Sequence, residues 1–135
     1  MKVLREIAPE VEKLFKEKNF ASFATMMADG SPQVTPVWVD YDGKNILINT
    51  AEGRIKLKNV DKNPKVATSI IDSENPYTMV TVRGRVIERT RDGADDHIEK
   101  MAKKYLGVEK YPFRAAGEKR VLLKIKPESV TFMTP

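Results

Sequence analysis

The spacing of hydrophobic residues predicts two amphipathic helices and one shorter helical segment. Residues 8–18 carry an apolar stripe with the spacing of one helix face. Residues 93–106 show that spacing more clearly, and Gly107 is well placed to end the helix. Residues 54–61 predict a short helix that stops before Pro64, because the residue preceding a proline avoids the helical conformation.

Elsewhere the pattern is that of β-strands separated by turn residues. Strands are predicted at residues 20–28, 32–41, 45–50, 65–71, 77–89 and 120–134, the last either one strand or a pair broken at Pro127. Asp29-Gly30 and Asp42-Gly43 are tight-turn signals, so the first three strands are expected to form an antiparallel meander. Gly84 predicts a sharp bend, as at a barrel corner. Together these elements predict one mainly β (α+β) domain over residues 1–135, a small closed barrel with helices outside.

Two prolines distinguish the strand predicted at residues 32–41. Pro32 and Pro36 both lack a backbone N–H, and residues four apart in a strand point to the same side. The strand therefore cannot pair fully along that side. It lies at a sheet edge, or it leaves backbone groups free for a ligand.

A cluster of cations follows the strand at residues 45–50. The chain passes through Gly53 into a helix start that carries Arg54, Lys56 and Lys58. A helix start presents free backbone N–H groups and the positive end of the helix dipole, so this stretch is suited to binding a phosphate. Lysine-rich helix starts also occur on solvated faces, and the glycine spacing of a nucleotide-binding loop is absent here.

Composition narrows the functional classes. The 135 residues suit a single domain and include no cysteine, which excludes disulfides and thiolate metal sites and is compatible with the cytoplasm. No apolar run is long enough to span a membrane, and the charged N-terminal residues argue against export. The net charge of +5 suits an anionic partner, but 19 acidic residues are interspersed with the basic ones.

No side-chain catalytic apparatus is visible. His97 is the only histidine. This count argues against a histidine-based catalytic triad and against a metal site built from several histidines. It follows Asp95 and Asp96 in the strongest helix and is expected at the surface. Asp72 and Glu74 could act as a pair of carboxylates, but their position in a solvated loop explains them better. We therefore expect no catalytic side chain and no metal site.

Several short motifs, in order and with consistent spacing, resemble a known family. They are residues 34–40 (VTPVWVD), Asn49-Thr50 with Arg54, Lys56 and Asn59, residues 63–66 (NPKV), 75–77 (NPY), 82–86 (VRGRV), 104–107 (KYLG) and 111–114 (YPFR). Over residues 20–133 the chain resembles the pyridoxamine 5'-phosphate oxidase-like flavin-binding split barrels. Within them it is most similar to small oxidoreductases that depend on the deazaflavin coenzyme F420.

This resemblance implies a fold and a cofactor. The fold would be a six-stranded antiparallel split β-barrel with flanking helices, forming a homodimer with FMN or F420 at the subunit interface. Arg54 and Lys56 would contact the phosphate, and the ring would lie against the backbone of residues 34–36. The cofactor-binding residues so implied are Val34, Thr35, Pro36, Asn49, Thr50, Arg54, Lys56, Lys58, Asn59 and Tyr77. Tyr77, Met79 and residues 111–114 are candidates for partner contacts, and Trp38 is expected in the core.

The implied activity is hydride transfer between the bound cofactor and a small organic substrate, with the cofactor supplying the chemistry. A carrier or sensor of the same fold that binds without turnover is an alternative. A basic nucleic-acid-binding barrel is disfavoured, because such barrels interleave aromatic residues with cations on one sheet face, whereas here aromatic residues are 7% of the chain and scattered.

Overall fold

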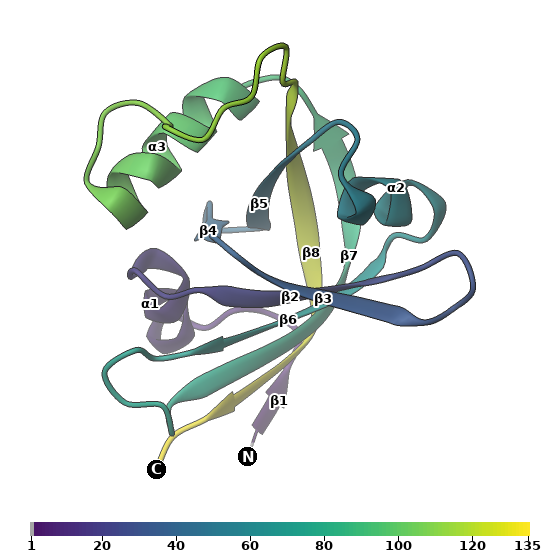
Figure 1. Ribbon diagram of the computed structural model, residues 1–135. Coiled ribbons are helices and arrows are strands. Elements are labelled where there is room, and N and C mark those ends of the chain that lie inside the picture. Colours follow the sequence, from purple (N-terminus) through teal and green to yellow (C-terminus); the bar gives the residue numbers. More distant parts are fainter. Residues whose placement is uncertain (1) are drawn as a thin grey trace.

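The computed structural model (Figure 1) describes residues 2–135. Three helices, α1 (Pro9–Lys16), α2 (Ile55–Lys62) and α3 (Ala94–Leu106), lie within one residue or two of the predicted ones. The strands are β1 (Lys2–Leu4), β2 (Ala21–Met26), β3 (Pro32–Val37), β4 (Asp40–Tyr41), β5 (Ile46–Ala51), β6 (Lys65–Ile71), β7 (Met79–Thr90) and β8 (Arg120–Met133).

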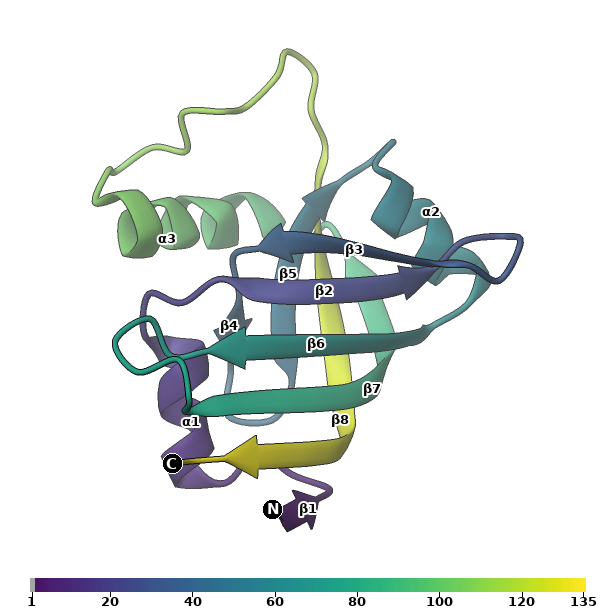
Figure 2. The same ribbon diagram turned by 60° about the horizontal axis from the view of Figure 1, so that its bottom comes forward.

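The strands form one antiparallel sheet that curls into a split barrel. Its order is β3-β2-β6-β7-β8-β5-β4, with β1 added beside the C-terminal part of β8. Figure 2 shows β7 and β8 curving from one layer of the barrel into the other. The mainly β split barrel with flanking helices that the family resemblance implied is confirmed. The closed barrel predicted from the elements alone is wrong, because β3 and β4 are the two ends of the sheet and do not pair with each other. The sheet has eight strands rather than six, because β1 was not predicted and the strand expected at residues 32–41 is divided.

That division corrects the predicted meander. β3 ends at Val37, the chain crosses the split through Trp38 and Val39, and β4 pairs with β5. β5 itself pairs with β8 on its other side and not with β3. β3 lies at the sheet edge with β2 as its neighbour, as its two prolines predicted.

The predicted bend at Gly84 is confirmed as a register shift between β7 and β8. Gly84 faces Pro127 across the pair, and the register changes between Arg83 and Gly84. A Cβ atom at Gly84 would lie 2.3 Å from the Lys126 carbonyl oxygen, so only glycine fits this close approach. Despite Pro127, β8 continues as one strand.

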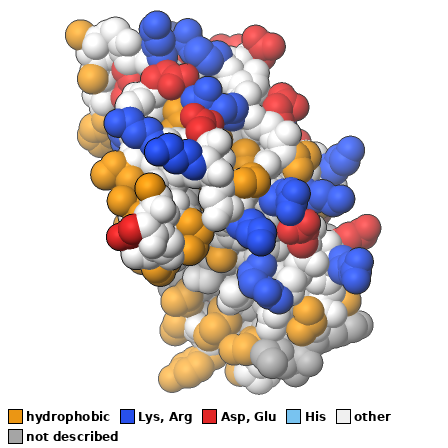
Figure 3. Space-filling model, turned by 90° about the vertical axis from the view of Figure 1, so that its right-hand side faces the viewer, with side chains coloured by type: hydrophobic (Ala, Val, Ile, Leu, Met, Phe, Trp, Pro, Cys, Tyr) orange, Lys and Arg blue, Asp and Glu red, His pale blue; other side chains and the backbone are white. Residues whose placement is uncertain are grey.

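The core fills the inside of the curled sheet. Its largest fully buried members include Phe15, Phe23, Ile46, Ile48, Ile70, Leu123 and Ile125. α1 packs against β4, β6 and β7, α2 against β2, and α3 against β5 and β8. On the face that carries α2, Lys and Arg side chains lie among acidic and hydrophobic ones (Figure 3). Within residues 2–135, none of the helices has the length and hydrophobicity needed to cross a membrane.

Candidate functional site

The connection from β5 to α2 has the geometry expected of an anion-binding helix start. Gly53 adopts a φ of 90°, which turns the chain sharply after β5. Arg54 then occupies the N-cap position, and no side chain caps the helix. The first turn contains no acidic residue. The helix start therefore keeps its positive dipole end and its first N–H groups available to a ligand.

The three cations of this stretch have different surroundings. Arg54 is 51% exposed, and its Nη2 lies 3.4 Å from Glu118 Oε1. Lys56 is partly buried, and burial, followed by the positive charges of Arg54 and Arg120, lowers its pKa. An anion nearby would relieve this repulsion. Lys58 is exposed and is not among the residues that line the cavity described next.

A cavity of about 210 Å³ lies beside this helix start and gathers half of the predicted site. Its lining residues are Phe20, Pro36, Val37, Trp38, Asn49, Thr50, Arg54, Lys56, Ile98, Tyr111, Phe113 and Arg120. They include three cations and four aromatic side chains. The cavity thus offers both charge for an anion and flat apolar surface for a ring.

The aromatic side chains of this cavity are held in a packed cluster. Trp38 stacks on Tyr105, with ring centroids 5.1 Å apart and an interplanar angle of 4°. Tyr111 meets Trp38 edge-on at 6.1 Å. Trp38 is half-buried and packs against the buried cluster of Ile98, Met101 and Tyr105, and it also forms part of the cavity wall.

Tyr105 and Lys104 fix this cluster to the chain that crosses the split. The Tyr105 hydroxyl donates to the Asn19 carbonyl oxygen at 2.6 Å and accepts from Val39 N–H at 3.1 Å. Burial raises the pKa of Tyr105 to about 12. Lys104 Nζ donates to the carbonyl oxygens of Phe15 and Val39, and burial lowers its pKa to about 8. These hydrogen bonds anchor the ring under Trp38 to the backbone at Asn19 and Val39.

The remaining predicted residues lie outside the cavity lining. Val34 and Thr35 precede Pro36 on edge strand β3, and Thr35 Oγ1 is buried without a hydrogen-bond partner among residues 2–135. Asn59 is buried, and its Nδ2 donates to Thr25 Oγ1 at 3.0 Å, so it secures α2 to β2. Tyr77 is 73% exposed in the loop before β7.

Sequence reasoning missed Arg120, which lies at the start of β8 and is only 4% exposed. Its Nε donates to Asn49 Oδ1 at 2.9 Å, and its Nη1 lies 3.3 Å from Glu118 Oε1. Its guanidinium carbon lies 5.1 Å from the Tyr111 ring centroid. No local motif marks this residue, because its partners come from β5 and from the loop after α3.

His97 is not the surface residue that was expected. Its side chain is 9% exposed, with Nε2 3.2 Å from Asp40 Oδ2 and Nδ1 3.1 Å from Asn49 Nδ2. Burial acts to raise the pKa of Asp40, but the bonds from His97 and the Tyr41 amide, with Lys100 and Lys16, hold it well below its usual range. A buried polar chain thus runs from Asp40 through His97 and Asn49 to Arg120.

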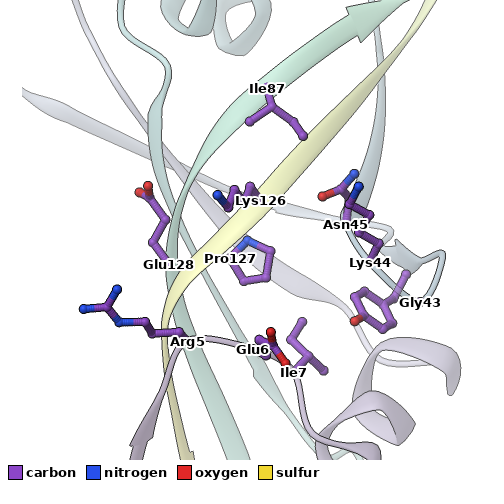
Figure 4. A pocket seen from close by; sticks show the side chains of 11 residues that line it. Arg5, Glu6, Ile7, Gly43, Lys44, Asn45, Ile87, Lys126, Pro127 and Glu128 are labelled. Atoms are coloured by element: carbon purple, nitrogen blue, oxygen red, sulfur yellow. The ribbon is translucent and has the colours of Figure 1, made fainter.

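A larger cavity, of about 790 Å³, lies elsewhere on the barrel (Figure 4). Its lining residues are Arg5, Glu6, Ile7, Tyr41, Gly43, Lys44, Asn45, Ile87, Lys126, Pro127 and Glu128. None of them is a predicted site residue. Its cations Arg5, Lys44 and Lys126 are exposed.

Comparison with known proteins agrees with the family expected from the motifs. Residues 7–134 match the family described as Pyridoxamine 5'-phosphate oxidase. A solved structure named F420 Reductase is 31% identical, with a TM-score of 0.79, covering 89% of this chain and 94% of that one. No curated protein matches the chain.

Two more distant structures share the fold. HupZ of Group A Streptococcus is 23% identical with a TM-score of 0.68, covering 94% of both chains. General Stress Protein 26 from Bacillus anthracis is 16% identical with a TM-score of 0.66, covering 91% of this chain and 90% of that one. At these identities the likeness concerns the fold alone.

Proposed function

This chain belongs to the pyridoxamine 5'-phosphate oxidase family, and from that premise we propose that it is an oxidoreductase that binds FMN or F420. It transfers hydride between the bound cofactor and a small conjugated or carbonyl-containing substrate. The observation that carries this proposal is that one cavity is lined both by Arg54, Lys56 and Arg120 and by aromatic side chains. A phosphorylated tricyclic cofactor needs both features in one place.

The residues present fit such a cofactor. Lys56 and Arg54, at the uncapped start of α2, would hold the phosphate, with the Thr50 hydroxyl beside them. Thr50 Oγ1 is buried and lacks a hydrogen-bond partner among the described residues, as expected of a group whose partner is a ligand. Lys58 lies outside the cavity lining, so it would contact the phosphate only in another side-chain conformation.

Edge strand β3 would hold the ring. Its unpaired side leaves backbone groups of alternate residues within Val34, Thr35 and Pro36 available to the ring edge. A flavin or deazaflavin, when bound, supplies the hydride chemistry itself. The protein orients the ring through these backbone groups, and Trp38 and Tyr111 exclude water from one side of the cavity.

The similarity to a protein named F420 Reductase supports F420 as the first candidate, with FMN as the alternative. We further propose a homodimer in the cytoplasm, with Tyr77, Met79 and residues 111–114 contacting the partner. Large hydrophobic side chains that are exposed on the single chain support partner contacts: Val34, Ile71, Tyr77, Phe113 and Met133. Sedimentation of a monomeric species at micromolar concentration would contradict the dimer.

The experiment is a titration of purified apoprotein with F420 and with FMN, followed by fluorescence. We expect saturable binding of at least one. Steady-state assays with reduced cofactor and small enones or quinones then separate an enzyme from a carrier or sensor. Absence of binding to both cofactors would contradict the proposed function, and binding without turnover of any such substrate would favour the carrier.

A further inference from the structure

The most unusual side chain in the cavity is the buried guanidinium of Arg120. A guanidinium has five N–H donors, and burying one without partners is costly. The Nε donor is used by Asn49 Oδ1. Nη1 is buried without a hydrogen-bond partner among residues 2–135, although it is close enough to Glu118 for an ion pair. This donor lines a cavity in which a ligand oxygen could accept it.

Thr50 supplies a second unsatisfied polar group in the lining of this cavity. Ala51 pairs with Arg120 across the β5–β8 ladder, so the side chains of Thr50 and Arg120 lie on opposite faces of the sheet although both residues line the same cavity. The Thr50 Oγ1 atom is buried, also lacks a partner within the described chain, and belongs to the same cavity. On the Arg120 side of the ladder the donor is therefore the guanidinium alone, and a guanidinium is suited to binding an anionic oxygen.

The orientation of Arg120 is set by the buried polar chain behind it. Asn49 Oδ1 accepts from Arg120 Nε, while Asn49 Nδ2 donates to the Ala94 carbonyl oxygen at 2.9 Å. The opposite amide orientation would place an NH₂ group against Arg120, so this one is fixed. Asn49 Nδ2 can then donate to His97 Nδ1.

His97 completes the connection to Asp40. Because its Nδ1 accepts from Asn49, its Nε2 carries the hydrogen that is donated to Asp40 Oδ2. The Asp40 carboxylate is 3.4 Å from Lys100 Nζ and 3.6 Å from Lys16 Nζ. Asp40 therefore holds the tautomer of His97 that Asn49 requires.

We propose that Arg120 binds an oxyanion of the ligand, and that Asn49, His97 and Asp40 position Arg120 for it. This inference rests on the proposed function and adds to it an anion-binding residue inside the cavity. The oxyanion is a phosphate or carboxylate, supplied by the cofactor or by an anionic substrate. Asn49 is accordingly a positioning residue, since both ends of its amide are engaged within the protein.

The test compares Arg120→Lys with the control Arg85→Lys, whose exposed ion pair to Glu128 lies outside this cavity. Each protein is titrated with FMN and riboflavin, and with F420 and the deazaflavin that lacks the phosphate. If the oxyanion belongs to the cofactor, Arg120→Lys weakens binding of the phosphate-bearing member about 10- to 100-fold and leaves the other unchanged. The control changes neither.

A second titration identifies a substrate oxyanion. Cofactor-loaded protein is titrated with inorganic phosphate, which in that case binds the wild type and not Arg120→Lys. Arg120→Lys behaving as wild type in both titrations overturns the inference.

If wild type binds neither cofactor, the proposed function fails, whereas inorganic phosphate binding to apoprotein still tests Arg120. Should Arg120→Lys not fold, the Arg120 Nε–H resonance of wild type must shift on phosphate addition; an unchanged resonance overturns the inference.

The positioning residues are tested with His97→Ala and His97→Gln. Alanine breaks the connection, so the preference for phosphate-bearing over phosphate-free cofactor should fall about 3- to 10-fold. Glutamine, whose amide can both accept and donate, should restore much of it. An alanine variant that loses stability yet keeps the full preference contradicts the positioning role.

Discussion

The two cavities of this barrel differ in the polar groups that line them as well as in size. The larger one, about 790 Å³, is lined by exposed cations together with Glu6 and Glu128, and Glu128 is already paired with Arg85 at 3.7 Å. The smaller one, about 210 Å³, contains the buried Arg120 and Thr50, and Arg120 Nη1 and Thr50 Oγ1 lack hydrogen-bond partners among the described residues. An exposed charge is hydrated and needs no protein partner, whereas a buried donor without a hydrogen-bond partner lowers the stability of the fold.

This difference indicates which cavity was shaped for a ligand. Aromatic surface, a helix start and unsatisfied polar groups converge on the smaller cavity, and these are features that a bound ligand would use. The larger cavity has room but lacks this convergence. The following variants test the contrast, from the largest expected effect to the smallest.

The largest effect is expected from Arg54→Ala combined with Lys56→Ala. Charge-assisted contacts contribute roughly 1.5–3 kcal/mol each, so cofactor affinity should fall about a hundredfold or more. The matched control is Lys44→Ala with Lys126→Ala, which removes two cations from the larger cavity and should leave affinity unchanged. Fluorescence titration measures both. Unchanged affinity in a folded Arg54/Lys56 variant rules out this phosphate site.

Asp40→Asn should lower the free energy of unfolding by about 2 kcal/mol at neutral pH, because it removes a buried, charge-assisted hydrogen-bond acceptor. The fold lowers the pKa of Asp40 from its ordinary 3.8, so the unfolded chain binds more protons below about pH 4. The stabilisation is thus fully present above pH 4 and is lost as the pH falls through the folded-state pKa.

Denaturant titrations across the acid range measure this effect. Asp40→Asn should flatten the dependence of unfolding free energy on pH below 4, while Asp61→Asn, whose ion pair with Arg89 is partly exposed, should retain the wild-type slope more closely. An equal slope in wild type and Asp40→Asn contradicts the assignment of this carboxylate to the buried chain.

Gly84→Ala should disturb the wall of the larger cavity and spare the smaller one. The added Cβ meets the Lys126 carbonyl oxygen, so β7 and β8 must separate locally, at a cost of about 1–3 kcal/mol in stability. Thermal unfolding measures the loss, and the neighbouring Arg85→Ala serves as the surface control. Cofactor affinity should stay at the wild-type value; a large loss would place the ligand nearer Lys126.

Lys58→Ala is the smallest expected change. Lys58 is exposed and outside the cavity lining, so its removal should alter affinity by less than about twofold, as for most surface substitutions. The same titration compares it with Lys56→Ala. A tenfold loss would mean that Lys58 turns toward the ligand.

Local patterns predicted most of the fold. The helix at residues 93–106 followed from its apolar spacing, the edge position of β3 from its two prolines, and the corner from Gly84. Each depends on neighbours close in sequence or on backbone restrictions of a single residue. The start of α2 was likewise predictable, because Gly53 and the cations lie on one short stretch.

Long-range contacts explain what sequence reasoning missed. Turn signals predicted that β3 would pair with β5, but β5 gains a longer buried ladder with β8, more than 70 residues later. His97 looked solvated beside Asp95 and Asp96, yet its partners Asp40 and Asn49 come from β4 and β5. Arg120 acquired its role only when β8 placed it beside Asn49.

The most direct test of the account is a crystal structure of the protein with F420 or FMN bound. The account predicts the phosphate at the start of α2 within hydrogen-bond distance of Lys56 or Arg54, and the ring along β3 against the aromatic wall. A cofactor bound instead in the cavity beside Pro127 and Lys126, with the start of α2 left to solvent, would contradict it.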